Sequence, residues 1–596
     1  MLLALIYLLS LRLAVAKPVS PRQAGSTAAP SVPTGSVVPT ATIYPSSASS
    51  QPVKVVGVNR PTVGYHSYLN IPFAQPPVGD LGFAPPQPAN YTNTTVIAQQ
   101  WSPACPQLKD AAQGFGDVSG SYEIQEDCLY INVFTPEGTT DNASLPVMFW
   151  VYGGGFVSGT ASTYDPSVLV AHSLAMVRPL VIAAAFQGRE SSAADLPGHP
   201  HRLRLEAVSL IECRKGKAFA DAGAANIGIR DITQGLWWVQ ENIWAFGGDP
   251  SKVTVAGQSA GAGLTSLLYL QQDQGLFRSA IMMSGGQDMT LQNSTVDVTP
   301  TGYDLLLNLT NCSTTLANES TIQCLRHVPY DALMAAQANI SAAYGPYSIS
   351  SPSVDGDLIP AQPYDLLQQG KFQRKPLLSG NVKDEGTLFL YQNLTSSADF
   401  TAYAAGLYNN DTAIVEQILQ LYPDNPSLGS PFDTGNQTFG WTPENKRAAA
   451  LFGDAVLQAP RRSFTRAAQA QGMQTWGYLT AQYPPDNLGL PPYAGAEPNL
   501  PAAAFHGDDI LYVFGLLPNA TAEYATVIDQ YMTYWTNFVV FTDPNGQGSN
   551  LTQWPSYNGD QKNSIQILGN GTTVIKDDYR EEAIAFLFDK PIKVSS

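Results

Sequence analysis

Ser259 is the residue whose type and setting most clearly predict chemistry, because it lies at the centre of the pentapeptide Gly257–Gly261. A serine hydroxyl is a poor nucleophile at neutral pH, so it needs a base, an acid that orients the base, and donors for the oxyanion. Glycines two positions before and after a serine are typical of the sharp strand-to-helix turn that presents a nucleophile. The apolar run 253–256 precedes this turn, and the helical pattern 259–270 follows it. We therefore predict that Ser259 is the nucleophile of an acyl-transfer reaction.

The base is expected among the six histidines, which are His66, His172, His199, His201, His327 and His506. Where such a turn carries the nucleophile, the acid and then the base follow it along the chain, which leaves His327 and His506. His327 lies in a helix-like stretch and comes too early to leave room for an acid before it. His506 lies in a loop-like sequence before the apolar run 510–514, so we predict that His506 is the base.

Two neighbouring carboxylates, Asp384 and Glu385, are candidates for the acid. Both lie just beyond the apolar run 376–379, and α/β sheets place functional side chains in loops at the C-terminal ends of their parallel strands. The spacing alone does not choose between the two residues.

The oxyanion donors are expected from a second glycine cluster. Gly153–Gly155 ends the apolar segment 147–152, and glycine lets the backbone approach a substrate closely. Together with the backbone N–H of Ala260, these glycines could form an oxyanion hole, in which each donor contributes about 2.7–4 kcal/mol.

The elements that must position these residues alternate along the chain. Short apolar runs typical of buried strands (147–152, 253–256, 279–284 and 375–379) are separated by helical patterns such as 231–245 and 259–270. Continuous apolar strands between helices predict an α/β fold with a large, mostly parallel sheet flanked by helices on both faces.

Composition narrows the class of protein further. The chain has 596 residues, of which 44% are hydrophobic and 13% charged, and its formal net charge is −17. Nucleic-acid binding requires a basic surface, so this balance argues against a nucleic-acid partner. The apolar N-terminus with an Ala-x-Ala site at 14–16 predicts a signal peptide over residues 1–16 and a secreted protein. No later run is apolar and long enough to predict a transmembrane segment.

The segment 17–52 is rich in Ser, Thr, Pro and Ala, so we predict a flexible tail there, with order beginning at Val53. The chain carries five cysteines, at positions 105, 128, 213, 312 and 324, and an oxidising compartment would let four of them pair. Frequent Asn-x-Ser/Thr acceptors predict N-linked glycans, at Asn90, Asn93, Asn142, Asn293, Asn308, Asn311, Asn318, Asn339, Asn393, Asn410, Asn436, Asn519, Asn550 and Asn570.

Several short stretches from Val53 onward together make a combination of motifs that is specific to one protein family: 70–79, 126–133, 152–156, 246–250, 257–261, 383–387, 506–507 and 512–515. With these stretches the chain resembles the type-B carboxylesterase/lipase family, which includes cholinesterases and fungal lipases, and most resembles its secreted fungal members. The resemblance implies an α/β-hydrolase fold in a single domain over 53–596. It also implies a carboxylic ester hydrolase, whose mechanism requires no metal and no organic cofactor.

The resemblance assigns roles to particular residues. It implies a catalytic triad of Ser259, Glu385 and His506, and thereby selects Glu385 over Asp384. The oxyanion hole that it implies is formed by Gly154, Gly155 and Ala260, and the disulfides are Cys105–Cys128 and Cys312–Cys324.

The substrate is expected to be a small-molecule or lipid ester. The segment 106–127 resembles the lid region of the family but is short and polar, which favours a soluble carboxylic ester over an acylglycerol as the substrate. A non-catalytic, cholinesterase-like binding glycoprotein is the alternative from another class. It is disfavoured because all three triad residues are present.

Two departures from the family pattern stand out. Gln258 occupies a position where the family usually has Glu, which predicts a shifted pH optimum. The segment 178–216 replaces a buried strand and a Gly-rich loop with an Arg-rich sequence. We favour an error in the gene model, which would remove a central strand, over a divergent structured loop or a functional insertion. Its His199, His201 and Cys213 are a weak candidate for a metal site, and we predict none there.

Overall fold

A computed structural model of the chain describes residues 38–45, 51–107, 123–185, 223–289, 301–313, 321–344, 352–389, 394–485, 503–517, 519–546 and 550–592. The chain from Val38 onward forms one compact unit. The predicted signal peptide (1–16) lies outside the described residues, as do residues 108–122 of the lid-like segment 106–127 and residues 186–222, which include His199, His201 and Cys213.

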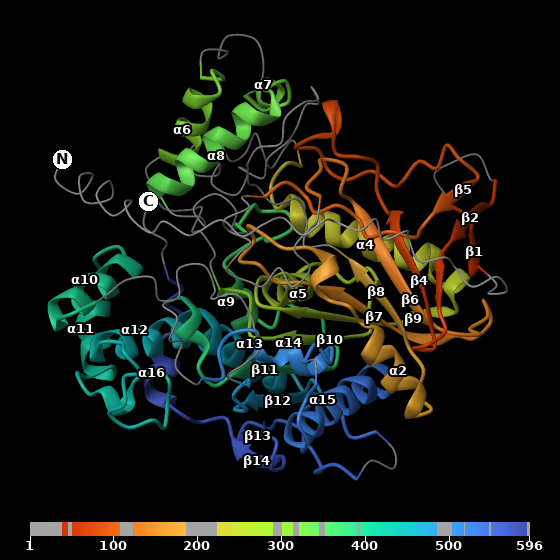
Figure 1. Ribbon diagram of the computed structural model, residues 1–596. Helices are drawn as coiled ribbons and strands as arrows, with labels where there is room; N and C mark the ends of the chain where they lie inside the picture. Colours follow the sequence, from red (N-terminus) through yellow and green to blue (C-terminus); the bar gives the residue numbers. More distant parts are fainter. Residues whose placement is uncertain are drawn as a thin grey trace, which may run out of the picture. The chain divides into compact units, whose positions relative to one another are not determined.

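The unit is built on an 11-stranded sheet with the order β14-β13-β12-β11-β10-β9-β7-β8-β6-β4-β3. The strands from β13 to β8 run parallel to one another, and antiparallel strands flank them on both sides (Figure 1). The strands are β3 (Val58–Arg60), β4 (Tyr65–Pro72), β6 (Tyr130–Pro136), β7 (Leu145–Val151), β8 (Val181–Ala185), β9 (Gly248–Gln258), β10 (Ser279–Met283), β11 (Leu377–Val382), β12 (Thr475–Thr480), β13 (Asn563–Ile567) and β14 (Thr573–Lys576).

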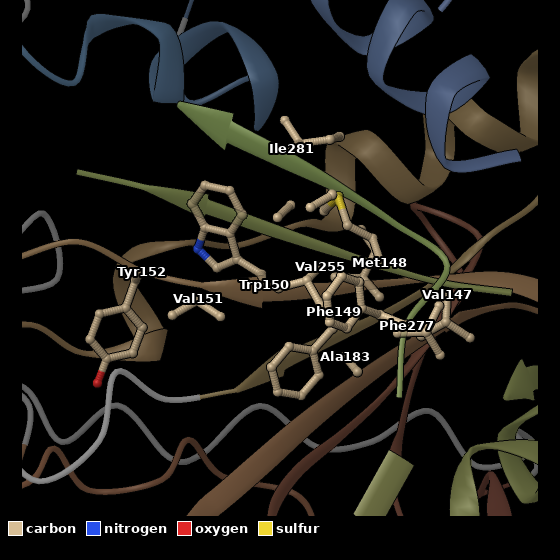
Figure 2. Close-up of a cluster of buried hydrophobic side chains, with 14 of the residues drawn as sticks. Val147, Met148, Phe149, Trp150, Val151, Tyr152, Ala183, Val255, Phe277 and Ile281 are labelled. Atoms are coloured by element: carbon tan, nitrogen blue, oxygen red, sulfur yellow. The ribbon is translucent and has the colours of Figure 1, made fainter. Parts of the chain in front are cut away.

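Parallel strands that are covered on both faces must carry apolar side chains on both faces. The central strands of this sheet do so. Figure 2 shows Trp150 and Phe149 on opposite sides of β7, next to Val255 of β9 and Ile281 of β10. Both aromatic side chains are fully buried. The α/β-hydrolase fold with a large, mostly parallel sheet, as predicted, is confirmed.

Helices cover the two faces of the sheet (Figure 1). Helices α4, α5, α9 and α13 pack on one face, whereas α2 and α15 pack on the other. The helices are α2 (Ser167–Ala175), α4 (Ile227–Asn242), α5 (Ala260–Leu270), α6 (Thr301–Leu309), α7 (Thr321–Leu325), α8 (Tyr330–Tyr344), α9 (Pro363–Gln368), α10 (Ser397–Leu407), α11 (Thr412–Leu421), α12 (Pro443–Gly453), α13 (Ala459–Ala470), α14 (Asp508–Val513), α15 (Ala522–Phe541) and α16 (Glu581–Phe586). Among the described helices, none combines the length and the apolar character that crossing a membrane requires.

The prediction of a flexible tail up to residue 52 was wrong at its end. Thr40–Ile43 forms strand β1, which pairs antiparallel with β2 (Val53–Val56). The strand alternates exposed and buried residues, so Ala41 and Ile43 face the core. Two apolar side chains at a spacing of two lie on one face of a strand and are enough to anchor it on the core. The surrounding Ser/Thr/Pro composition concealed this pattern in the sequence.

The expected loss of a central strand in segment 178–216 was also wrong. Strand β8 lies within the sheet, parallel to β7 and antiparallel to β6. Val181, Ile182 and Ala183 are fully buried, and the strand continues to Ala185, so the apolar start of the segment supplies the strand. The rest of the segment, from residue 186, lies outside the described residues.

Two cysteine pairs are bridged as the resemblance implied. Cys105 pairs with Cys128 at a Cα–Cα distance of 5.1 Å, and Cys312 pairs with Cys324 at 5.7 Å. The first pair closes the lid-like segment 106–127, and the second pair joins the turn after α6 to α7.

Candidate active site

Ser259 lies at the turn between β9 and α5, where its backbone adopts φ 56° and ψ −127°. A non-glycine residue in this region is strained, and such strain is typical of a nucleophile turn. Both flanking positions must be glycine, because a side chain would not fit at either of them. A Cβ on Gly257 would lie 2.4 Å from the Gly261 carbonyl oxygen, and a Cβ on Gly261 would lie 2.1 Å from that of Val151. The chain can therefore turn here only because both positions lack a side chain.

Three of the predicted residues form a continuous hydrogen-bonded chain. Ser259 Oγ lies 2.7 Å from His506 Nε2, and His506 Nδ1 lies 2.6 Å from Glu385 Oε2. An ionised carboxylate can only accept, so Nδ1 carries the ring proton and Nε2 is left to accept the proton of the serine hydroxyl. All three side chains are buried.

The structure also separates the two candidate acids. The carboxylate of Asp384 accepts hydrogen bonds from the Phe432 N–H, the Ser430 hydroxyl and the Ala504 N–H. Asp384 thus ties the loop that carries Glu385 to Ala504, two residues before the base, while Glu385 contacts His506. The rejected base, His327, is exposed and contacts the Gln323 carbonyl in its own helical turn.

The glycines after β7 lie directly beside the nucleophile. A Cβ on Gly153 would lie 2.8 Å from Ser259 Cβ, and Gly154 and Gly155 adopt φ values of 135° and 64° that favour glycine. Ala260 is the first residue of α5. The N–H groups of Gly154, Gly155 and Ala260 donate no hydrogen bond within the described part of the chain. This geometry suits an oxyanion hole.

Two further buried carboxyl groups lie near the triad. Asp508 and Asp509 begin α14 immediately after His506-Gly507, and the Tyr478 hydroxyl donates to Asp509 Oδ2. Burial, together with the nearby charge of Glu385, raises the pKa of Asp509 to about 7. Burial also raises the pKa of Asp508 well above its usual range. Both shifts extend to higher pH the range in which these two groups are neutral.

Two further side chains touch the base. The Gln258 amide nitrogen lies 3.3 Å from His506 Nε2, and the Phe389 ring lies 5.0 Å from the imidazole, centroid to centroid. Sequence reasoning found Gln258 through its place in the turn, but it missed Phe389 and Asp509. For Asp509, the only signal was its position three residues after the base.

Within the described ranges, no group of three or more His, Cys, Asp or Glu residues is placed to hold a metal ion. A cavity of about 830 Å³ opens among α11, α12 and α16, and neither the serine nor the other triad residues line it.

Comparisons with known proteins show the family of this chain. The model of the carboxylesterase family matches residues 51–186 and 219–587. The chain belongs to the carboxylesterase family. Secreted lipase 1 of Botryotinia fuckeliana (strain B05.10) is 34% identical over 585 residues, which cover 92% of each chain. Lipase 2 of Geotrichum candidum is 32% identical, over 87% of this chain and 91% of that protein.

A solved structure supports the fold. The crystal structure of Aspergillus niger EstA matches with a TM-score of 0.72 at 23% identity, over 90% of this chain and 96% of that one. As a member of this family the protein is a carboxylic ester hydrolase. The family match also stops at residue 186 and resumes at 219, so the departure from the family pattern is confined to 187–218 rather than beginning at Arg178.

Proposed function

We propose that this carboxylesterase-family protein is a secreted serine esterase that hydrolyses carboxylic esters through an acyl-enzyme on Ser259. The observation that carries the proposal is the chain of contacts from Ser259 Oγ through His506 to Glu385, with spacings of 2.7 and 2.6 Å. An exposed serine with no base would need a different mechanism.

The proposed reaction has two steps. Ser259 Oγ attacks the ester carbonyl carbon while His506 Nε2 takes the hydroxyl proton, and the N–H groups of Gly154, Gly155 and Ala260 hold the oxyanion. His506 then gives this proton to the departing alcohol, and the acyl group stays on Ser259. In the second step, a water attacks the acyl-enzyme by the same route and releases the carboxylic acid. Glu385 stabilises the imidazolium in both steps.

Covalent labelling tests this proposal. An organophosphonate should add one adduct at Ser259 and abolish hydrolysis of p-nitrophenyl acetate, and Ser259→Ala should lose both properties. Ser266→Ala is the matched control, because Ser266 is another buried serine of α5 and donates only to the Gly263 carbonyl. A folded wild-type protein that takes no adduct and hydrolyses no ester would refute the enzyme proposal and favour a binding glycoprotein.

A lipase acting on acylglycerols is the second candidate, and the names of the similar fungal lipases favour it. Against it stands the short, polar segment 106–127 between the first two cysteines. Rates on p-nitrophenyl esters of rising chain length, compared with rates on emulsified triacylglycerol, discriminate the two substrates. An esterase loses rate as the chain lengthens, whereas a lipase gains rate when an emulsion forms.

Secretion and glycosylation belong to the same proposal. Every Asn-x-Ser/Thr acceptor within the described residues is exposed, including Asn142, Asn339 and Asn570, as attachment of a glycan requires. A similar protein is named a secreted lipase. We expect the expressed protein to appear in the medium, to begin near Lys17, and to lose mass on treatment with an endoglycosidase.

A further inference from the structure

The catalytic glutamate is held from behind by a set of buried polar residues. Glu385 Oε1, the oxygen that does not face His506, accepts hydrogen bonds from the Asn381 side-chain amide at 2.7 Å and from the Val382 N–H at 3.0 Å. Asn381 lies near the end of β11 and is fully buried. Because both oxygens of Glu385 are engaged in different directions, the carboxylate cannot rotate without losing a partner.

The Asn381 amide is itself held in one orientation. Its carbonyl oxygen accepts a hydrogen bond of 2.7 Å from Arg461 Nε on α13. A guanidinium can only donate and a carboxylate can only accept. The amide oxygen must therefore face Arg461 and the amide nitrogen must face Glu385. Turning the amide over would place two donors together on one side and two acceptors on the other.

Arg461 is in turn fixed by Asp577. Its Nη1 and Nη2 lie 2.6 and 2.9 Å from the two carboxylate oxygens, a bidentate pair in which both side chains are 1% exposed. Arg462 also binds Asp577, and the Tyr579 hydroxyl accepts from Arg461 Nη2 at 3.0 Å. Burial of a charged arginine is tolerated because every side of its fork is occupied.

We infer that Asn381, Arg461 and Asp577 are positioning residues for the catalytic acid, and that they act through Asn381 to keep the Glu385 carboxylate aimed at His506. The inference rests on the proposed function of the triad and extends it to three residues that touch no reacting atom. A π-helical turn (Asp454–Gln458) leads directly into α13. Gln458 from this turn donates to the Val382 carbonyl. The same helical segment therefore contacts both Asn381 and Val382, the two β11 residues that donate to Glu385.

Other titratable groups lie near Glu385, and they set the expected direction of the pH effect. They are His506, Asp508 and Asp509 at the start of α14, Tyr478 of β12 and the preceding residue Asp384. All except His506 are acids, so Asn381 and Arg461 supply the donor and the positive charge on this side. Removing either one makes the Glu385–His506 pair hold a proton more tightly, and the acid limb of the kcat/KM profile should move to higher pH.

The experiment compares Asn381→Leu, Asn381→Asp and Arg461→Lys with the wild type. Leucine keeps the volume but cannot donate, and aspartate places an oxygen against Glu385. Lysine keeps the charge but cannot donate to Asn381 and both oxygens of Asp577 together. Rates are divided by the number of sites that an organophosphonate labels, so misfolded molecules do not count. We expect kcat to fall about 10- to 100-fold with little change in KM, the usual scale for a lost hydrogen bond to a charged group.

The acid limb should move up most for Asn381→Asp and least for Arg461→Lys. Arg447→Lys is the matched control, because Arg447 is also buried and paired with Glu444 but does not contact Asn381 or Glu385. It should lower the unfolding temperature and leave the acid limb in place. Wild-type kcat per labelled site and an unmoved limb in the Asn381 variants would overturn the inference. A wild type that neither labels nor hydrolyses esters would instead overturn the proposed function itself.

Discussion

The contact between Gln258 and the base leads to a quantitative prediction for Gln258→Glu. The amide nitrogen of Gln258 is buried 3.3 Å from His506 Nε2, and glutamate has almost the same shape. A unit charge at that distance would interact with an imidazolium by about 5 kcal/mol at an effective dielectric constant of about 20, as an upper bound. The cost of burying a second carboxylate next to Glu385 and Asp509 offsets most of this energy.

We therefore expect the acid limb of the kcat/KM profile to move up by about one pH unit, which corresponds to roughly 1.4 kcal/mol. The sign follows from the chemistry. A negative charge stabilises the imidazolium, so the base stays protonated to a higher pH and activity at acidic pH is lost. Activity on the alkaline side should be unchanged or higher, because the transition state also contains an imidazolium.

The assay is hydrolysis of a soluble p-nitrophenyl ester from pH 4.5 to 9, with Gln420→Glu as a control. Gln420 is an exposed residue of α11, so its replacement adds the same charge far from the base and should leave the profile in place. A Gln258→Glu profile that superimposes on the wild type would refute the reasoning that Gln258 tunes the base.

Three further predictions concern stability. Gly261→Ala should destabilise the protein by about 1–3 kcal/mol and reduce labelling of Ser259, because its Cβ would lie 2.1 Å from the Val151 carbonyl oxygen; Gly406→Ala on α10, where the Cβ meets open space, should instead stabilise by about 0.4–1 kcal/mol in chemical denaturation. Burial raises the pKa of Asp509 from 3.8 to about 7 in the folded state, so the folded protein keeps a proton that the unfolded chain has released, and stability falls as pH rises from about 4 to 7. Asp509→Asn should flatten this decline, and an equal slope of unfolding free energy against pH in the variant would contradict the assignment. Replacing Cys312 and Cys324 by serine opens a loop of sequence separation 12 and should cost about 3 kcal/mol in thermal unfolding, with kcat at 25 °C unchanged because neither cysteine touches the triad.

How much of the site could be predicted depends on how local its causes are. The turn at Ser259 is a five-residue event, in which Gly257 and Gly261 are demanded by atoms within the turn and by the neighbouring strand β7. Such a motif carries its own geometry, so the residue types alone indicated it. The choice between Asp384 and Glu385 is different, because it depends on which carboxylate faces His506, 121 residues away from Glu385. Residue spacing could not supply that orientation, and only the resemblance did.

The two errors along the chain share a physical cause. Strand β1 and strand β8 are short, and each lies next to a segment of unlike composition. Composition averages over a window, whereas a strand needs only a few side chains on the correct face and a partner with free hydrogen-bonding groups. Val181–Ala183 is buried between β7 and β6 whatever follows it. The sheet that carries Ser259 is thus complete at β8, and the departure from the family pattern at 187–218 lies beyond that strand.

The residues behind Glu385 show where motif-based prediction ends. Asn381 is four residues from Glu385, but Arg461 is 80 residues from Asn381, and Asp577 is another 116 residues further along. Each is an ordinary residue type in its own segment, and their meaning arises only when β11, α13 and the end of β14 meet. A buried arginine that satisfies one carboxylate and orients one amide has no freedom to be replaced by a residue of merely similar charge. If Arg461→Lys retains full activity at every pH, Asn381 and the Val382 N–H must hold the catalytic acid without help from Arg461, and the triad would be less dependent on its surroundings than its burial indicates.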